Sequence, residues 1–132
     1  MRTTTWQPVW VEDMPETMEG GKIYISTKHL LTEHSCACGC GAEVSLPLGR
    51  SDWKIEYDGK TLSIWPSVGN WQLPCKSHYI IQKNKTRWCR RWSEEEILAG
   101  RSRDRKEKQQ DIEEKQKERK WWKRILRMIC RD

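Results

Sequence analysis

The sequence lacks phenylalanine and long apolar runs, and only 36% of its 132 residues are hydrophobic. This share is below the usual apolar content of globular proteins, which excludes a large hydrophobic core. No stretch approaches the length of a transmembrane helix, and residues 1–20 contain no apolar segment of the kind found in signal peptides. We therefore expect a small cytoplasmic protein.

A long basic face is also missing from the first part of the chain. The net charge of +6 divides evenly, because residues 1–92 hold 12 Lys and Arg against 9 acidic residues and residues 93–132 hold 13 against 10. A charge of +3 on each part is modest for a nucleic-acid-binding protein. One stretch nevertheless interleaves cations with rings that can stack on bases, which keeps nucleic-acid binding as an alternative. It consists of Arg87, Trp88, Arg90, Arg91 and Trp92.

Cysteine is abundant, with six residues that are mostly clustered. In a reducing compartment, clustered cysteines indicate metal ligands more than disulfides, although extracellular disulfides are the competing interpretation. Cys36, Cys38 and Cys40 alternate with small residues, and Cys75 and His78 form a second close-set pair. Two ligands from each stretch would make a closed structural Zn²⁺ site.

The expected zinc ligands are Cys38, Cys40, Cys75 and His78, with Cys36 as an alternative ligand. Any two of the three clustered thiols can complete the set of four ligands. Cys38 and Cys40 are favoured, because Gly39 and Gly41 let the chain curl around a metal. The alternative interpretation is an ordinary buried thiol and a buried histidine.

Alternation of apolar and polar residues predicts strands over 22–26 and 42–48, with a short edge strand near 9–11. Two hairpins follow: residues 53–57 and 61–65 joined through Asp58-Gly59, and residues 79–82 and 86–89 joined by a turn at 83–85. We predict a mainly β fold, a small zinc-ribbon-like antiparallel β domain with a long C-terminal α-helix. The expected parts are an N-terminal arm (1–21), a zinc-binding β domain (22–92) and a charged helix (93–132).

The helix is predicted to begin at the capping box Ser93-Glu94-Glu95-Glu96 and to end in a basic amphipathic segment. Residues 103–120 are nearly all charged or Gln and offer no apolar stripe. The last turns carry apolar residues on one face and cations on the other. The expected partner-binding residues are Trp121, Trp122, Ile125, Leu126 and Ile129. A protein partner, another copy of the chain or an anionic membrane surface can each cover such a face.

Four motifs recur together in this chain: the CxCGCG pattern at residues 36–41, the segment from Leu62 through Trp65-Pro66-Ser67, the CxSHYxI pattern at residues 75–81, and Trp88. With these motifs, residues 20–92 resemble a family of small bacterial and phage proteins. This resemblance implies a compact, mostly β, zinc-binding domain. Some relatives are similar to proteins encoded beside bacterial ubiquitin-like conjugation genes, which implies an accessory role in such a system and no particular activity.

Three classes of function follow from these observations. The leading hypothesis is a zinc-stabilised protein-interaction module, accessory to a bacterial ubiquitin-like conjugation or anti-phage system. Nucleic-acid binding is the second class. The third is a zinc- or Cys-dependent hydrolase or ligase, with Cys36 beside His34 as the reactive pair and Glu33 and Glu43 as the nearest carboxylates.

Overall fold

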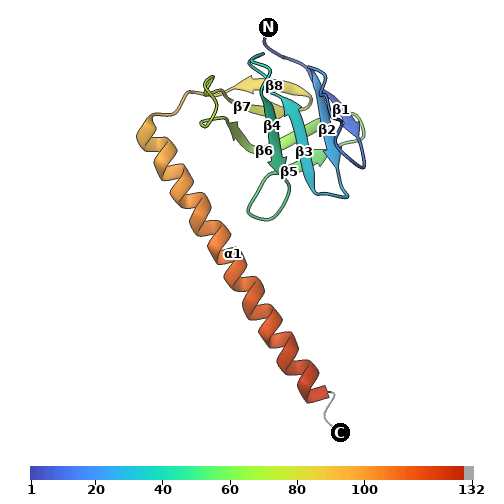
Figure 1. Cartoon of the computed structure of the whole chain (residues 1–132), viewed down its shortest axis with the longest axis vertical. Coiled ribbons are helices and arrows are strands. Elements are labelled where there is room, and N and C mark those ends of the chain that lie inside the picture. The colour runs from blue at the N-terminus through green and yellow to red at the C-terminus, as the bar shows by residue number, and fades with distance from the viewer. Residues whose placement is uncertain (130–132) are drawn as a thin grey trace. The chain divides into compact units, whose positions relative to one another are not determined.

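In this computed structural model, which describes residues 1–129, the chain divides into two compact units, Met1–Ser93 and Glu94–Asp132. The first unit contains two four-stranded sheets (Figure 1). One sheet holds β1 (Gln7–Trp10), β2 (Lys22–Ser26), β3 (Leu31–Ser35) and β4 (Glu43–Pro47). The other holds β5 (Lys54–Tyr57), β6 (Leu62–Gly69), β7 (His78–Gln82) and β8 (Lys85–Trp88).

Strands lie in sequence order within each sheet, and every pair except the parallel β1 and β2 is antiparallel. Both predicted hairpins are present, as β5 with β6 and β7 with β8. In the first hairpin, the Asp58 side chain accepts hydrogen bonds from the backbone amides of Lys60 and Thr61 at 2.9 and 2.7 Å. The prediction of a mainly β fold with a C-terminal helix is confirmed.

A single core cluster joins the two sheets. Its side chains come largely from alternate positions of β2, β4, β6 and β7, as the period of two in each strand predicts. They include Ile23, Ile25, Val44, Leu46, Leu62, Ile64, Tyr79 and Ile81. Because this core is small, the few residues that connect the sheets at their edges matter for the fold.

The segment expected to be an N-terminal arm, residues 1–21, packs against both sheets. Trp6 is buried in the core, and its indole nitrogen donates to the Thr86 hydroxyl at 2.7 Å. The backbone of Thr5 forms an isolated bridge with Lys85 of β8. A little further along the chain, β1 pairs with β2. The buried ring explains why this segment belongs to the first compact unit.

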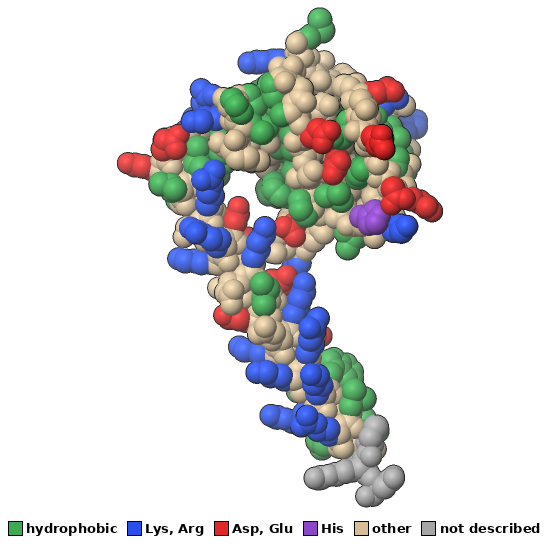
Figure 2. Space-filling model, in the orientation of Figure 1, with side chains coloured by type: hydrophobic (Ala, Val, Ile, Leu, Met, Phe, Trp, Pro, Cys, Tyr) green, Lys and Arg blue, Asp and Glu red, His purple; other side chains and the backbone are tan. Residues whose placement is uncertain are grey.

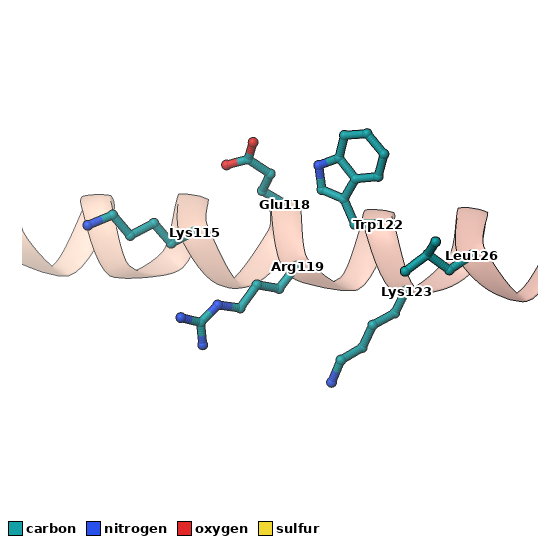
Figure 3. Close-up of a pocket in the computed structure, with 6 residues that line it drawn as sticks. All are labelled: Lys115, Glu118, Arg119, Trp122, Lys123 and Leu126. Carbon is teal, nitrogen blue, oxygen red and sulfur yellow. The ribbon is translucent and has the colours of Figure 1, made fainter.

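The second unit is a single helix, α1 (Glu94–Ile129), which is continuous through Gly100 and Ser102. Its first turn is acidic, which suits the positive end of a helix dipole. Among the described residues, no helix is long and apolar enough to cross a membrane. Lys and Arg side chains line α1, and hydrophobic ones gather on one side near its end (Figure 2). Trp122 projects from one side of these last turns, and Arg119 and Lys123 project from the other (Figure 3).

Candidate active site and metal centre

Ser67 of β6 and His78 of β7 form a hydrogen-bonded pair. The Ser67 hydroxyl lies 2.8 Å from Nε2 of His78, and Nδ1 of the same ring lies 2.7 Å from the backbone carbonyl oxygen of Arg90. Because a carbonyl oxygen can only accept, Nδ1 carries the ring proton and Nε2 accepts the Ser67 hydroxyl proton. An imidazole oriented in this way by a third group is the arrangement that activates a serine nucleophile.

An irregularity in β6 brings these two side chains together. Ile64 pairs with Ile81 and Val68 pairs with Tyr79, so β6 advances four positions while β7 advances two. The additional residues of β6 bulge out between these pairs, and a bulge redirects side chains next to it. As a result Ser67 is partly exposed, while the following Val68 is buried.

Two tryptophans hold the His78 ring in place. The ring centroids of Trp71 and Trp92 lie 5.0 and 5.3 Å from that of His78, and the two indoles stack on one another at 5.4 Å. Gly69 makes room for this packing, since a Cβ there would lie 2.6 Å from Nε1 of Trp71. His78 is 8% exposed, so its ring has little freedom to turn away from Ser67.

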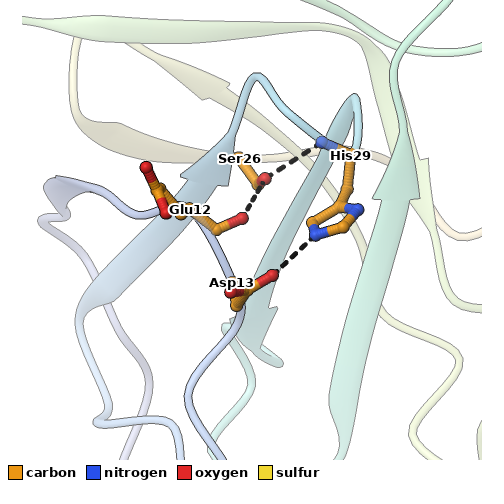
Figure 4. Close-up of polar contacts among 4 residues, drawn as sticks. All are labelled: Glu12, Asp13, Ser26 and His29. Atoms are coloured by element: carbon orange, nitrogen blue, oxygen red, sulfur yellow. Dashed lines mark hydrogen bonds and ion pairs between the residues drawn. The ribbon is translucent and has the colours of Figure 1, made fainter.

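The other two histidines are engaged differently. His29 pairs with the Asp13 carboxylate at 2.7 Å, but it contacts the Ser26 hydroxyl only through its backbone amide, at 3.1 Å (Figure 4). That hydroxyl donates to the carbonyl oxygen of Glu12, so Ser26 has no imidazole base. Among the described residues, His78 is therefore the histidine whose ring contacts a serine hydroxyl.

His34 is fully buried, and its Nε2 lies 2.7 Å from the Tyr79 hydroxyl. Burial lowers the pKa of His34 to about 3, and burial also raises the pKa of Tyr79. His34 is thus a neutral ring within the core. The hypothesis of a reactive Cys36 beside His34 gains no support from these contacts, because the Cys36 thiol is hydrogen-bonded to other groups.

Four thiols gather beside the Ser67 and His78 pair. The Sγ atoms of Cys36, Cys38, Cys40 and Cys75 all lie within 4.8 Å of one another, and none of these residues forms a disulfide. Cys36 Sγ lies 3.5 Å from Cys38 Sγ and 3.8 Å from Cys75 Sγ, and Cys40 Sγ lies 3.9 Å from Cys75 Sγ. Tetrahedral zinc with Zn–S bonds of about 2.3 Å requires separations of about 3.8 Å. The thiols therefore fit a four-coordinate metal ion.

Ser77 and Asn70 support this cluster from the protein side. The Ser77 hydroxyl lies 3.1 Å from Cys36 Sγ and 3.5 Å from Cys75 Sγ, and it accepts a hydrogen bond from the Asn70 amide at 3.0 Å. Asn70 also donates to Cys36 Sγ at 3.5 Å. Hydrogen bonds of this kind orient metal ligands. Since His78 follows Ser77 directly, the cluster also fixes the start of β7.

The thiols differ in acidity. Burial, the largest influence, would raise the pKa of Cys75, but hydrogen bonds with Ser77 outweigh it and lower the pKa to about 7. Burial and hydrogen bonding to Cys40 raise the pKa of Cys38 to about 12. Metal binding requires thiolates, so a bound metal would have to displace the proton that Cys38 holds.

The structure brings together three of the four expected zinc ligands, Cys38, Cys40 and Cys75. Cys36, the expected alternative, is the fourth member of the cluster. His78 is not in it, because both ring nitrogens are hydrogen-bonded to other groups. Cys89 lies outside the cluster, and Cys130 lies outside the described residues.

The expected partner-binding residues lie on the last turns of α1. Trp121, Trp122, Leu126 and Ile129 are exposed, with Ile125 partly exposed. Two rings of the stretch expected to stack on bases instead pack within the first unit. The ring centroid of Trp88 lies 5.4 Å from that of Tyr79, and Trp92 packs on His78.

Sequence reasoning missed Ser67. A signal was present, because Pro66-Ser67 and Ser77-His78 both fall in the motifs that carry the resemblance. Only the register of β6 against β7, with its bulge, places the two side chains in contact.

Fold and site together define a small β domain that carries a Ser–His pair beside a four-cysteine cluster. Residues 10–89 match the model of the family described as bacterial ubiquitination-like system serine protease (BubE), and the chain belongs to this family. This finding confirms the expected link to bacterial ubiquitin-like conjugation systems. No curated protein and no solved structure shows significant similarity to the chain.

Proposed function

We propose that the protein is a serine protease of a bacterial ubiquitination-like system, with Ser67 as the nucleophile and His78 as the general base. The observation that carries this proposal is the 2.8 Å contact between the Ser67 hydroxyl and Nε2 of His78, whose Nδ1 is fixed by the Arg90 carbonyl oxygen. The family description, which names a serine protease, supports the same chemistry.

The reaction follows from these contacts. Ser67 Oγ attacks the carbonyl carbon of a peptide bond while its proton passes to Nε2 of His78. The imidazolium keeps its Nδ1 proton against the Arg90 carbonyl oxygen. The Nε2 proton then passes to the leaving amine as the C–N bond breaks, which leaves an ester on Ser67. Water then attacks the ester carbonyl carbon and gives a proton to Nε2 of His78. As the bond from this carbon to Ser67 Oγ breaks, Nε2 returns the proton to Oγ, which restores the hydroxyl and releases the acid product.

The third group differs from the carboxylate of a Ser-His-Asp triad. A backbone carbonyl sets the tautomer and the direction of the ring, but it carries no full negative charge to stabilise the imidazolium. The tryptophans at positions 71 and 92 supply the remaining orientation.

For the four-cysteine cluster we propose Zn²⁺, held by Cys36, Cys38, Cys40 and Cys75. A closed set of four thiolates leaves no position for water or substrate, so the ion would stabilise the fold and take no part in the reaction. This assignment keeps zinc in the structural role expected from the sequence.

The protein-interaction role predicted from the sequence is compatible with a protease. An enzyme of a conjugation system acts on protein partners, and the exposed turns of α1 offer one surface besides the site.

The test compares Ser67→Ala with Ser45→Ala, which removes a hydroxyl from exposed Ser45 of β4. The probe is a library of fluorogenic peptidyl-coumarin substrates, and the readout is kcat/KM. We expect kcat/KM to fall by at least about a thousandfold in Ser67→Ala, because the acyl-enzyme can no longer form. Ser45→Ala should retain activity. Hydrolysis that survives in a folded Ser67→Ala protein would refute the assignment.

A further inference from the structure

The end of α1 has a composition unlike the rest of the helix. Residues 119–129, named here the terminal segment, contain five Lys or Arg, six apolar residues and no acidic residue. The preceding stretch, 103–118, alternates acidic and basic residues. Its contacts include an ion pair of Lys115 with Asp111 at 3.2 Å and a hydrogen bond from Gln109 to Glu113 at 3.2 Å.

Helical geometry separates the two kinds of side chain completely. At about 100° per residue, the six apolar side chains fall within an arc of about 160°, and the five cations fall on the opposite side. The apolar residues are Trp121, Trp122, Ile125, Leu126, Met128 and Ile129. Their exposed fractions reach 54% at Leu126 and 72% at Ile129, so this face carries no covering in the described residues. Figures 2 and 3 show the same separation near the end of the helix.

A second copy of the helix is a poor cover for this face. In the two turns that lead directly into the terminal segment, the same side of α1 presents Asp111, Glu114 and Glu118. The apolar stripe is therefore only about three turns long, whereas a stable coiled coil needs at least three or four heptads. Cations flank the stripe along its whole length, so two paired segments would also repel each other.

An anionic lipid surface matches each of these features. Its negative charge complements five cations that have no acidic neighbour within the segment. Trp121 and Trp122 lie toward opposite borders of the stripe, and indole rings favour the boundary between headgroups and acyl chains. A short helix with such faces lies in the plane of the interface and does not span the bilayer.

We propose that the terminal segment of α1 binds anionic membrane surfaces. The apolar face inserts between headgroups, and the Lys and Arg side chains pair with lipid phosphates. This inference does not depend on the proteolytic assignment.

The experiment is flotation of the full-length protein with vesicles of phosphatidylcholine alone and of an equal mixture with phosphatidylglycerol. We expect binding to the anionic vesicles that weakens as salt rises, and little binding to phosphatidylcholine. Equal binding to both vesicle types, or none to the anionic vesicles, would overturn the proposal.

Paired variants separate the two faces of the segment. Lys123→Gln with Arg127→Gln should weaken partition by about thirtyfold, since each cation contributes about fivefold. Arg103→Gln with Lys106→Gln makes the same charge change outside the segment and should retain most of the binding. Leu126→Glu should abolish binding, whereas Ile112→Glu, also on an exposed helix position, should not.

Circular dichroism of each variant confirms that α1 is retained. Vesicle binding that persists in the helical Leu126→Glu protein would overturn the proposal. So would a dimer in sedimentation measurements that Leu126→Glu converts to a monomer, or capture of this face by an acidic protein groove without vesicle binding.

Discussion

At the scale of single residues, the site depends on how few positions the His78 ring can occupy. One nitrogen is fixed by the Arg90 carbonyl oxygen, the other meets Ser67, and two indoles pack against the ring. A buried imidazole that is already oriented for the proton transfer loses little entropy when it takes up a proton from the nucleophile. Small changes in its packing should therefore affect catalysis more than stability.

Gly69→Ala tests this dependence. The added methyl group would lie 2.6 Å from Nε1 of Trp71, so the indole must move and release the ring of His78. We expect kcat to fall by about tenfold to a hundredfold with KM nearly unchanged, because the positioning of the base is disturbed and substrate binding is not.

Gly20→Ala is the matched control, because no atom lies within 4 Å of a Cβ at that position. It should leave kcat unaltered. Equal losses of kcat in both variants would mean that the effect comes from the backbone and not from Trp71.

At the scale of elements, the hairpin of β5 and β6 positions the strand that carries Ser67. Its turn is closed by Asp58, whose carboxylate accepts hydrogen bonds from two backbone amides and the Thr61 hydroxyl. Hydrogen bonds from Thr61 and Lys60 lower the pKa of Asp58 from its ordinary value of 3.8 to about 2.

This shift makes the hairpin sensitive to acid. At a pH between the two pKa values of Asp58, this side chain is more often protonated in the unfolded chain than in the folded one. Its contribution to the free energy of unfolding is therefore present above pH 3.8 and is lost toward pH 2. Denaturant titrations should show a shallower loss of stability in this window for Asp58→Asn than for the unaltered protein. Glu56→Gln removes a carboxylate from the same hairpin and should keep the steeper slope; identical slopes for all three would refute this role.

The cysteine cluster connects the loop after β3 to the start of β7, and zinc would secure that connection. Cys36→Ala and Cys75→Ala should lose the bound metal and lower the thermal midpoint by about 10 °C or more, because a structural metal contributes several kcal/mol to folding. Metal content by mass spectrometry is the direct measurement.

Cys89→Ala is the control for that comparison, since Cys89 lies outside the cluster. It should retain one zinc ion per chain. Native protein that holds no metal, or a Cys75→Ala variant that holds as much as the control, would contradict the assignment.

At the scale of the whole molecule, the chain combines a compact β unit with a helix that has little apolar surface until its last turns. Much of this organisation could be predicted from sequence, because it rests on local signals. Alternation gives the strands, Asp58-Gly59 gives a turn, and the capping box at Ser93 gives the start of α1.

The rest depends on contacts between distant segments. Trp6 is buried where the neighbouring Thr5 pairs with Lys85, a contact that no local pattern indicates. Membership of the cysteine cluster depends on how the loop after β3 meets the segment before β7. The contact of Ser67 with His78 depends on the bulged register of β6 against β7. Close spacing of Cys75 and His78 suggested a shared metal, but the strand that begins at His78 turns the ring toward β6.

The most direct test of the central claim is labelling of the full-length protein with a fluorophosphonate, which reacts with activated serines, followed by peptide mapping. We expect an adduct on Ser67, and a labelling rate that falls by about a hundredfold or more in His78→Gln, since the general base is removed. A folded protein in which Ser67 stays unmodified, or in which His78→Gln labels as fast as the unaltered chain, would contradict it.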